Sequence, residues 1–293
     1  MKTIASTIRT LPSRGTTSRY YATKNRNLAS HMPKTQRKAQ GPGQKVSAGY
    51  EEAARLLRER GPPLIPGTFI SLPFSQYPRT LFEAWQYQIA RSKTWMSETA
   101  SLLTLKISSM RSWTKRPRWK ARRSTIPPTA VALLRQSLEA LAARDRETLK
   151  RICVANYADR LIATLDRRPS REGRRFSFDL GSWSLWYPSI KSHIVVKLDN
   201  STMIEQTVVA INSRQTMSSY ILATGETVPG SLRMQHKVEY VVMSRLVDTV
   251  KYELQPWKLW GIVTPTTLEE YFMHKISTEK DMIHKAGWKK SDT

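Results

Sequence analysis

The sequence has little of the chemistry on which catalytic and metal sites are usually built. Cys153 is its only cysteine, which excludes an intrachain disulfide and a cysteine-based zinc site. None of the histidines lies three or four residues from another histidine or from Cys153, so no metal site is predicted. A phosphate-binding glycine-rich loop and a nucleophile elbow are also missing. We therefore predict a protein that is not an enzyme and has neither a cofactor nor a metal.

Long apolar runs and, in two stretches, acidic residues are missing as well. No run of about 18 apolar residues occurs, so only peripheral contact with a membrane is expected. Residues 1–50 contain ten Lys and Arg and residues 99–138 contain nine, with no Asp or Glu in either stretch. These stretches supply 19 of the 25 net positive charges. Such concentration indicates a targeting segment and a polyanion-binding segment, not a uniformly basic fold.

Residues 1–21 have the composition of a mitochondrial presequence. Basic residues are spaced among Ser, Thr and small apolar side chains, and the continuous apolar core of a secretory signal is missing. Arg19-Tyr20-Tyr21-Ala22 is similar to the cleavage pattern of the matrix protease, so we place the mature start near Ala22. The alternative is a basic tail that is not cleaved. The predicted location is the mitochondrial matrix.

The next part of the chain is predicted to be a tail, a connector and a helix. Residues 22–60 form a basic flexible tail with one short helix. Leu64 to Pro78 is rich in proline and is predicted to be an extended connector. Arg79 to Ile107 has the pattern of a helix. Its predicted stripe consists of Leu81, Trp85, Gln88/Ile89 and Ser92, with Trp95, Leu102 and Leu105 beyond. Two interpretations are open: the helix packs on its own domain, or it lies against a partner macromolecule or the membrane surface.

The second concentration of positive charge follows this helix and predicts RNA binding. Arginine forks pair with phosphate groups, and tryptophan can stack on exposed bases or on ribose. Pro117 prevents one continuous helix. We therefore predict that residues 61–126 are an extended and helical, basic RNA-binding extension. Its predicted contact residues are Arg111, Trp113, Lys115, Arg116, Arg118, Trp119, Lys120, Arg122 and Arg123.

An arginine-rich loop is a second candidate phosphate contact. The residues predicted to touch RNA are Arg171, Arg174 and Arg175, with Gly173 among them. A solvated turn with no ligand is the alternative interpretation.

Helices followed by strands indicate an α+β domain that starts near residue 127. The first helix has an apolar face from Val131 to Leu141, and Asp145 is the expected N-cap of a second helix that runs past Cys153 to Leu165. Strands are predicted at Phe176–Tyr187, Ser192–Leu198, Met203–Ser213 and Ser218–Thr224, with two more between His236 and Val263. The turn signal Asp199-Asn200 predicts that the second and third strands form a hairpin.

A few single residues have two interpretations each. His193 and His236 lie near the beginnings of strands, where they could face a pocket or be ordinary half-buried histidines. Asp179 could be a buried general base, but its position between Phe176 and Phe178 favours an outward side chain. Cys153 is predicted to be a small core residue and not a nucleophile.

The last part of the chain has the order of elements of a known family. An alternating strand ends before Pro256, Trp257 begins a second strand that includes Trp260, and Thr267 is a suitable helix N-cap. This order resembles the end of the Tim44-like domain, and residues 127–275 look most similar to mitochondrial large-subunit ribosomal proteins of the mL45 type. The resemblance implies a cystatin/NTF2-like form, with helices packed on a curved antiparallel sheet, and leaves 276–293 as a C-terminal tail. Trp257 and Trp260 should lie on opposite faces of their strand, either both in the core or with one at a membrane interface.

The resemblance also implies a function. It is that of a structural component of the mitochondrial ribosome large subunit near the polypeptide exit, a monomer within the ribosome. The implied partners are large-subunit rRNA, neighbouring large-subunit proteins, the inner membrane surface and an Oxa1-type insertase. Two alternatives are open: a Mba1-like reversible membrane-bound ribosome receptor, and a Tim44-type presequence-translocase motor component. A motor component should have a long charged, heptad-rich region, whose place is taken here by the proline-rich connector and the basic block.

Overall fold

The computed structural model describes residues 61–73, 76–112, 114–169, 171–180, 186–198 and 201–285, with side chains as far as residue 277. The predicted presequence, the basic tail with its short helix, Trp113 and residues 286–293 lie outside this part of the chain. The described residues all belong to one compact unit.

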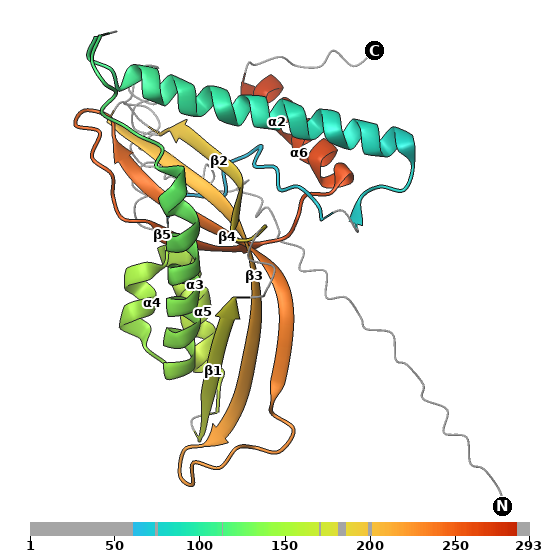
Figure 1. Cartoon of the computed structure of the whole chain (residues 1–293), viewed down its shortest axis with the longest axis vertical. Coiled ribbons are helices and arrows are strands. Elements are labelled where there is room, and N and C mark those ends of the chain that lie inside the picture. The colour runs from blue at the N-terminus through green and yellow to red at the C-terminus, as the bar shows by residue number, and fades with distance from the viewer. Residues whose placement is uncertain are drawn as a thin grey trace, which may run out of the picture. The chain divides into compact units, whose positions relative to one another are not determined.

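Five antiparallel strands form one open sheet, which confirms the predicted α+β class. The strands are β1 Glu172–Leu180, β2 Ser189–Lys197, β3 Thr202–Ile221, β4 Arg233–Asp248 and β5 Lys258–Val263. The long strands β3 and β4 pair with each other, and β5 continues the sheet beyond β4 (Figure 1). β1 and β2 share the other side of β3, each along one half of it. The pairing of β2 with β3 confirms the predicted hairpin.

Two strand predictions are wrong in their bounds. The predicted break between Ser213 and Ser218 does not exist, because β3 continues through it with β1 on one side and β4 on the other. Polar residues there weaken the alternating apolar pattern from which the strand was predicted. The backbone is extended because it pairs with β1 on one side and with β4 on the other. The first strand begins at Glu172, before the predicted start at Phe176, and its ladder with β3 ends at Leu180.

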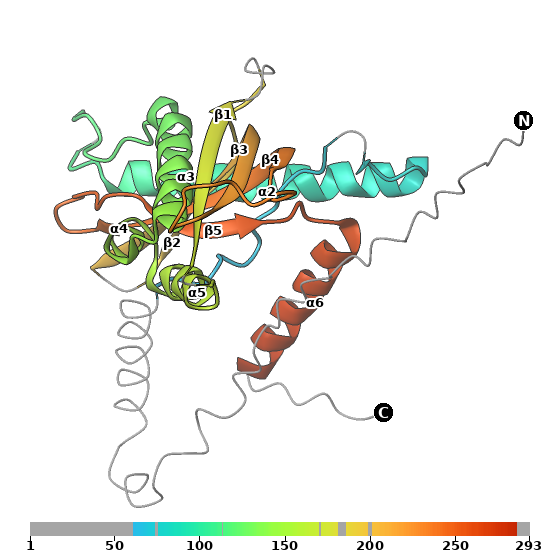
Figure 2. The same cartoon turned by 90° about the horizontal axis from the view of Figure 1, so that it is seen from below.

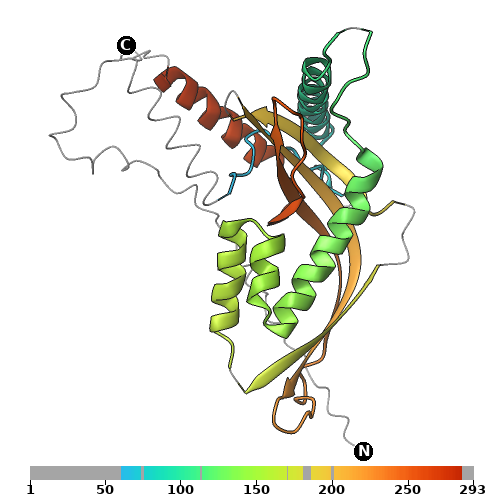
Figure 3. The ribbon, with the colours of Figure 1, turned by 90° about the vertical axis from the view of Figure 1, so that its left-hand side faces the viewer.

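Three helices cover one face of the sheet (Figure 3): α3 Ile126–Ala143, α4 Arg146–Ile152 and α5 Ala155–Asp166. Asp145 caps α4 as predicted, since its carboxylate accepts from the N–H of Thr148 at 3.0 Å. The predicted second helix is in fact two helices, because the N–H of Val154 donates to the carbonyl of Leu259 in β5. Cys153 is buried at this junction.

The connector covers the opposite face of the sheet. It is extended, as predicted, and Ile70 packs there against strand residues such as Val208. The N–H of Ile65 donates to the side-chain oxygen of Gln206 at 2.9 Å. A segment that supplies core residues is part of the fold, so the folded unit begins before the predicted boundary at residue 127.

The two tryptophans of the last strand region lie on opposite faces, as predicted. Trp257 packs against the core under the helices, and Trp260 packs against the core under the connector. The indole N–H of Trp260 donates to the carbonyl of Pro62 at 2.6 Å. Because both side chains are partly buried inside this unit, neither is a free membrane anchor.

Two further helices are α2 Leu81–Ser108 and α6 Leu268–Lys285. The first turn of α6 packs against α2, and the rest of α6 runs away from it (Figures 1 and 2). Thr267 caps α6 as predicted: its hydroxyl accepts from the N–H of Glu270 at 3.2 Å, and the carboxylate of Glu270 accepts from the N–H of Thr267 at 3.0 Å. Because α6 continues to Lys285, the predicted tail at residue 276 begins inside a helix.

Candidate nucleic-acid and membrane interface

Residues 109–123, which we call the basic segment, connect the end of α2 to α3. Its described basic side chains are exposed, and within the described part of the chain none of them forms an ion pair with a carboxylate. They are Arg111, Lys115, Arg116, Arg118, Lys120, Arg122 and Arg123. Uncompensated positive charges at this density attract polyanions, and RNA phosphates supply the matching charge.

Trp119 does not have the role predicted for it. Its side chain is only 2% exposed and packs with Leu105, Val195 and Val247 in a core of its own, so the ring is not available to stack on bases. The prediction was wrong because the sequence does not show that α2 and the sheet leave an apolar recess at this point. The buried ring instead attaches the basic segment to the sheet.

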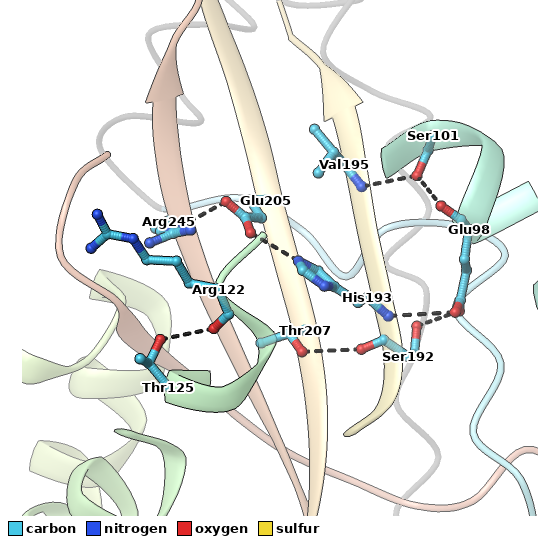
Figure 4. Close-up of polar contacts among 10 residues, drawn as sticks. All are labelled: Glu98, Ser101, Arg122, Thr125, Ser192, His193, Val195, Glu205, Thr207 and Arg245. Atoms are coloured by element: carbon cyan, nitrogen blue, oxygen red, sulfur yellow. Dashed lines mark hydrogen bonds and ion pairs between the residues drawn. The ribbon is translucent and has the colours of Figure 1, made fainter. Parts of the chain in front are cut away.

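The rest of the basic segment is folded into tight turns. The N–H of Arg118 donates to the carbonyl of Ser109 at 3.4 Å. Arg122 has a left-handed backbone with φ of 38°, and its carbonyl accepts from the N–H and the hydroxyl of Thr125 at 3.0 and 2.9 Å (Figure 4). A non-glycine residue keeps such a conformation only where its surroundings fix it. The positive charges therefore stand on a backbone of defined shape.

The other predicted phosphate contacts lie far from the basic segment. Arg171 and Arg175 are exposed and Arg174 is half-buried. Arg175 pairs with Ser218 near the far end of β3, whereas the basic segment packs beside Met203 near the start of that strand. The fifteen residues between Met203 and Ser218 correspond to roughly 50 Å along the strand. The structure therefore does not bring the two predicted sets together.

The helix α2 carries an apolar stripe on the side that faces away from the sheet. We call it the outer stripe; it consists of Leu81, Trp85, Ile89, Met96, Leu103 and Ile107. The exposed fractions are 91% for Leu81, 66% for Trp85 and 64% for Met96. A surface helix normally turns its apolar side to the core, and large exposed apolar patches mark interaction surfaces. The helix itself packs on its own domain, as one of the two interpretations from the sequence has it, because Tyr87, Ala90 and Leu105 are buried in core clusters. The stripe that begins at Leu81 and Trp85 instead faces outward.

A buried polar cluster holds the opposite side of α2 against the sheet (Figure 4). The carboxylate of Glu98 accepts from the hydroxyl of Ser192 at 2.5 Å and from the N–H of His193 at 3.4 Å. One helical turn later, the hydroxyl of Ser101 accepts from the N–H of Val195 at 3.4 Å. β2 is an edge strand here, so side chains of α2 occupy backbone groups that would otherwise be open to pairing. Because Glu98 faces the sheet, the rotation of α2 is fixed and the outer stripe faces outward.

Glu205 lies at the centre of this cluster with no exposed side-chain surface. It receives one hydrogen bond from the ring of His193 and one from the guanidinium of Arg245, each at 2.8 Å. Burial alone would raise the pKa of Glu205, but these two hydrogen bonds hold it below its usual value. The guanidinium of Arg245 also lies 4.2 Å from the centre of the Trp257 ring. The side chain of His193 is thus fully buried, and its Nε2 is paired with Glu205.

The remaining candidate groups have unremarkable surroundings. His236 and Asp179 are exposed, the latter as predicted. Burial raises the pKa of the Cys153 thiol to about 12, which keeps it protonated and unreactive at neutral pH. Within the described ranges no three His, Cys, Asp or Glu residues are grouped to hold a metal ion. The helices in those ranges are each too short or too polar to cross a bilayer.

The carboxyl group of Glu98 should make stability depend on pH near neutrality. Burial raises its pKa to about 7, against hydrogen bonds from Ser192 and His193 and the charge of Arg123, which lower it. Because this folded-state pKa lies above the unfolded value of 4.5, the group stabilises the fold at low pH, and this contribution is lost as pH rises from about 4.5 to about 7. The loss amounts to at most about 3 kcal/mol.

Glu98→Gln should remove this dependence, because glutamine cannot ionise. Its amide oxygen can accept from the N–H of His193 while its NH2 group donates to the hydroxyl oxygen of Ser192. We expect the variant to be more stable than the wild type at pH 8 and no more stable at pH 5, measured as urea unfolding free energies. Glu83→Gln, at an exposed position of the same helix, is the matched control and should leave the pH profile unchanged. Equal pH profiles for Glu98→Gln and the wild type would show that Glu98 ionises normally in the fold.

Sequence reasoning missed the residues that fix this interface. The sequence pattern does not show that Glu98 meets the edge of the sheet, and the pairing of Glu205 with Arg245 joins residues that lie 40 positions apart in the sequence. One signal was available: Glu205 stands on the side of β3 that carries Val209 and Ile211, where a charge needs a partner. The sequence does not say which cation supplies it.

Comparisons with known proteins do not show a family for this chain. No family model matches the sequence, and no curated protein matches it. Among solved structures, the intermembrane space region of the chloroplast protein ARC6 is similar at a TM-score of 0.29 and 13% sequence identity, over 52% of this chain and 100% of that one. A likeness at this level says nothing about function, so the function has to be inferred from the residues themselves.

Proposed function

We propose that this chain is a structural component of the mitochondrial ribosome large subunit near the polypeptide exit. It binds large-subunit rRNA through the basic segment, and it helps to tether the ribosome to the inner membrane through the outer stripe of α2. In this proposal the sheet and its helices are a Tim44-like domain of cystatin/NTF2-like form. The chain reaches the matrix by its presequence and catalyses no reaction.

The observation that carries the proposal is that the outer stripe leads directly into the basic segment. The exposed cations Lys93 and Lys106 stand on α2 beside the stripe. An apolar stripe with cationic flanks fits the surface of an anionic bilayer, where each buried Leu or Ile side chain contributes about 1.5–3 kcal/mol. Trp85 and Trp95, both exposed, have the amphipathic rings that suit the headgroup region.

The mechanism in this proposal is positional. A ribosome held with its exit beside an Oxa1-type insertase keeps the nascent hydrophobic chain close to the insertion machinery. Tethering raises the effective concentration of the chain at the insertase without any new contact between the two. Fixed geometry matters for this role, and the buried Glu98 contacts supply it by setting the direction in which the stripe faces.

Two acidic substitutions in the outer stripe test the membrane contact. Trp85→Asp/Met96→Asp places charges where the bilayer should be, at positions exposed in the fold. We expect flotation with phosphatidylcholine vesicles containing cardiolipin to fall at least about tenfold, which is 1.4 kcal/mol, with the unfolding temperature unchanged. The matched control Ser97→Asp/Thr104→Asp adds the same charge to α2 at exposed positions outside the stripe. Its flotation with the vesicles should fall much less. Equal losses for the two variants would mean that charge alone, and not the stripe, governs binding.

Sedimentation tests the ribosomal part of the proposal. Detergent-solubilised mitochondria are run through a sucrose gradient at roughly 0.5 M salt, where contacts that depend only on exposed charges weaken greatly. Co-migration with the large subunit, lost after ribonuclease treatment, is the expected result. Migration with ribosomes only at low salt would favour a reversible receptor. Absence from ribosomes at both salt concentrations would favour the import-motor alternative and overturn the proposal.

A further inference from the structure

We infer that the arginines around the start of β1 form a second phosphate-binding site, which holds a stretch of RNA other than the one on the basic segment. The inference rests on the proposed function, since it takes RNA as the ligand. We call this group the β1 arginine cluster. It consists of Arg144, Arg168, Arg171, Arg174 and Arg175.

A cavity of about 360 Å³ opens beside this cluster, between the end of α3 and the edge of β1. Arg144, Arg174 and Arg175 line it together with Tyr220. Glu139 is the only carboxylate residue among its described lining residues, and its oxygen is already 3.6 Å from the guanidinium of Arg135. The walls therefore have an excess of positive charge, which suits an anionic ligand.

Two of the arginines fix the loop that carries the others. The guanidinium of Arg144 donates to the carbonyl oxygens of Pro169 and Glu172, and that of Arg168 donates to the carbonyl of Leu141 at 2.7 Å. Arg144 does this from a left-handed backbone, with φ of 59°, at the end of α3. The backbone at Pro169 and Glu172 is thus held in place before any ligand arrives, which lowers the entropy lost on binding.

The cluster holds like charges close together. Burial lowers the pKa of Arg168, and the positive charges of Arg174 and Arg144 lower it further. The guanidinium of Arg174 has one weak contact, to the sulfur of Met217 at 3.8 Å, and forms no ion pair within the described residues. A phosphate between these groups removes part of their repulsion and matches the fork geometry of arginine.

Tyr220 gives the site an aromatic wall. A Cβ atom at Gly173 would lie 2.3 Å from Cζ of Tyr220, so the absence of a side chain at Gly173 lets this ring lie across the strand. The guanidinium of Arg175 lies 5.7 Å from the centre of the ring. Aromatic rings beside guanidinium groups are how single-stranded nucleic acids are held, with bases on the ring and phosphates on the cations. This pairing favours RNA over a free inorganic anion.

The distance between the two sites decides what kind of RNA can use both. They are separated by roughly 50 Å along β3, so a tetranucleotide reaches only one of them. A long structured RNA can occupy both, and the second contact is then intramolecular and strengthens overall binding. The chain would thereby fix two separate stretches of rRNA relative to each other.

The test measures RNA binding by the purified full chain, using a labelled tetranucleotide and a long structured fragment of large-subunit rRNA. Arg174→Glu/Arg175→Glu alters the cluster and spares Arg144 and Arg168, which hold the loop. The comparison variants are Arg118→Glu/Lys120→Glu in the basic segment and Arg151→Glu/Lys258→Glu, which reverses two exposed charges elsewhere.

We expect two tetranucleotides to bind per wild-type chain and one per chain of the cluster variant. For the long RNA, the affinity of the cluster variant should fall at least about tenfold. The plot of the logarithm of the binding constant against the logarithm of the salt concentration should become shallower by about 1.4. This is the change expected when two phosphate contacts to a single strand are lost. The Arg151→Glu/Lys258→Glu variant should keep two sites and most of the affinity.

The outcomes separate this inference from the proposed function. If the cluster variant behaves like the Arg151→Glu/Lys258→Glu control while the basic-segment variant loses RNA, the inference is overturned and the proposed function stands. If only the cluster variant loses RNA, the second site is real and the assignment of the basic segment is wrong. If the wild type binds neither RNA, both fail. Binding of inorganic phosphate with no RNA binding at the cluster would also overturn the inference.

Discussion

Glu205→Ala should lower the free energy of unfolding by about 3–5 kcal/mol. The side chain of Glu205 has no exposed surface, and it neutralises Arg245, whose side chain is 9% exposed. Removing the carboxylate leaves a buried guanidinium without a counterion and the ring of His193 without its acceptor. In a unit of this size, each kcal/mol corresponds to roughly 2–4 °C in melting temperature. Urea unfolding at pH 7 and thermal unfolding both measure the effect.

Two variants show whether the loss comes from the unpaired charge. Glu205→Leu/Arg245→Met removes both members of the pair and should recover much of the stability, because no isolated buried charge is left. Asp179→Ala removes an exposed carboxylate from β1 and should change stability by less than about 0.5 kcal/mol. If Glu205→Ala lowers the free energy of unfolding no more than Asp179→Ala does, the buried pair does not hold the strands together.

The carboxylate of Glu205 should also make the folded protein less stable at acidic pH. Since hydrogen bonds hold the pKa of Glu205 below its unfolded value, its contribution to stability is present above the unfolded pKa and is lost as pH falls through the folded one. Glu98 acts in the opposite direction, because its pKa is raised to about 7. Stability should therefore pass through a maximum on the acid side of neutrality.

Trp119→Ala should lower the free energy of unfolding by about 3–5 kcal/mol. It should also weaken RNA binding, although no charge is changed. The ring fills the recess between α2 and the sheet, where it contacts Leu105, Val195 and Val247. Without it, the basic segment loses its attachment, and its cations must be ordered by the RNA at an entropic cost. Thermal unfolding and RNA titration at one fixed salt concentration measure the two effects.

Trp119→Phe is the matched control. It keeps an aromatic ring in the recess and removes the indole N–H, which is buried and has no hydrogen-bond partner among the described residues. We therefore expect both stability and RNA affinity to stay much closer to the wild type than in Trp119→Ala. An unchanged RNA affinity in a destabilised Trp119→Ala protein would show that the basic segment binds RNA without a fixed backbone.

Features that depend on neighbouring residues were predicted well. The caps at Asp145 and Thr267 are local hydrogen bonds between a side chain and a backbone three residues away, so a short stretch of sequence contains all the participants. The opposite facing of Trp257 and Trp260 follows from the course of the backbone through one short strand. The α+β class follows from the order of such elements along the chain.

Features that depend on which surfaces meet were not predicted. The 3.6-residue period marked an apolar stripe at Leu81 and Trp85, but period alone cannot distinguish a stripe that faces a core from one that faces a partner. Here the choice is made by Glu98, a single acid on the other side of the helix, because it meets Ser192 and His193. The same limit applied to Trp119, whose recess is built by three separate segments.

The sequence by itself determined the distribution of charge, the helix caps, the alternation of the strands and the absence of an intrachain disulfide. These properties follow from residue identity and from contacts over a few residues. Only the tertiary structure decided that α2 turns its apolar side outward, that Trp119 is an anchor, and that the two arginine-rich regions lie at opposite ends of β3. Each of these depends on contacts between residues distant in the chain, whose pairing is set when the whole unit packs.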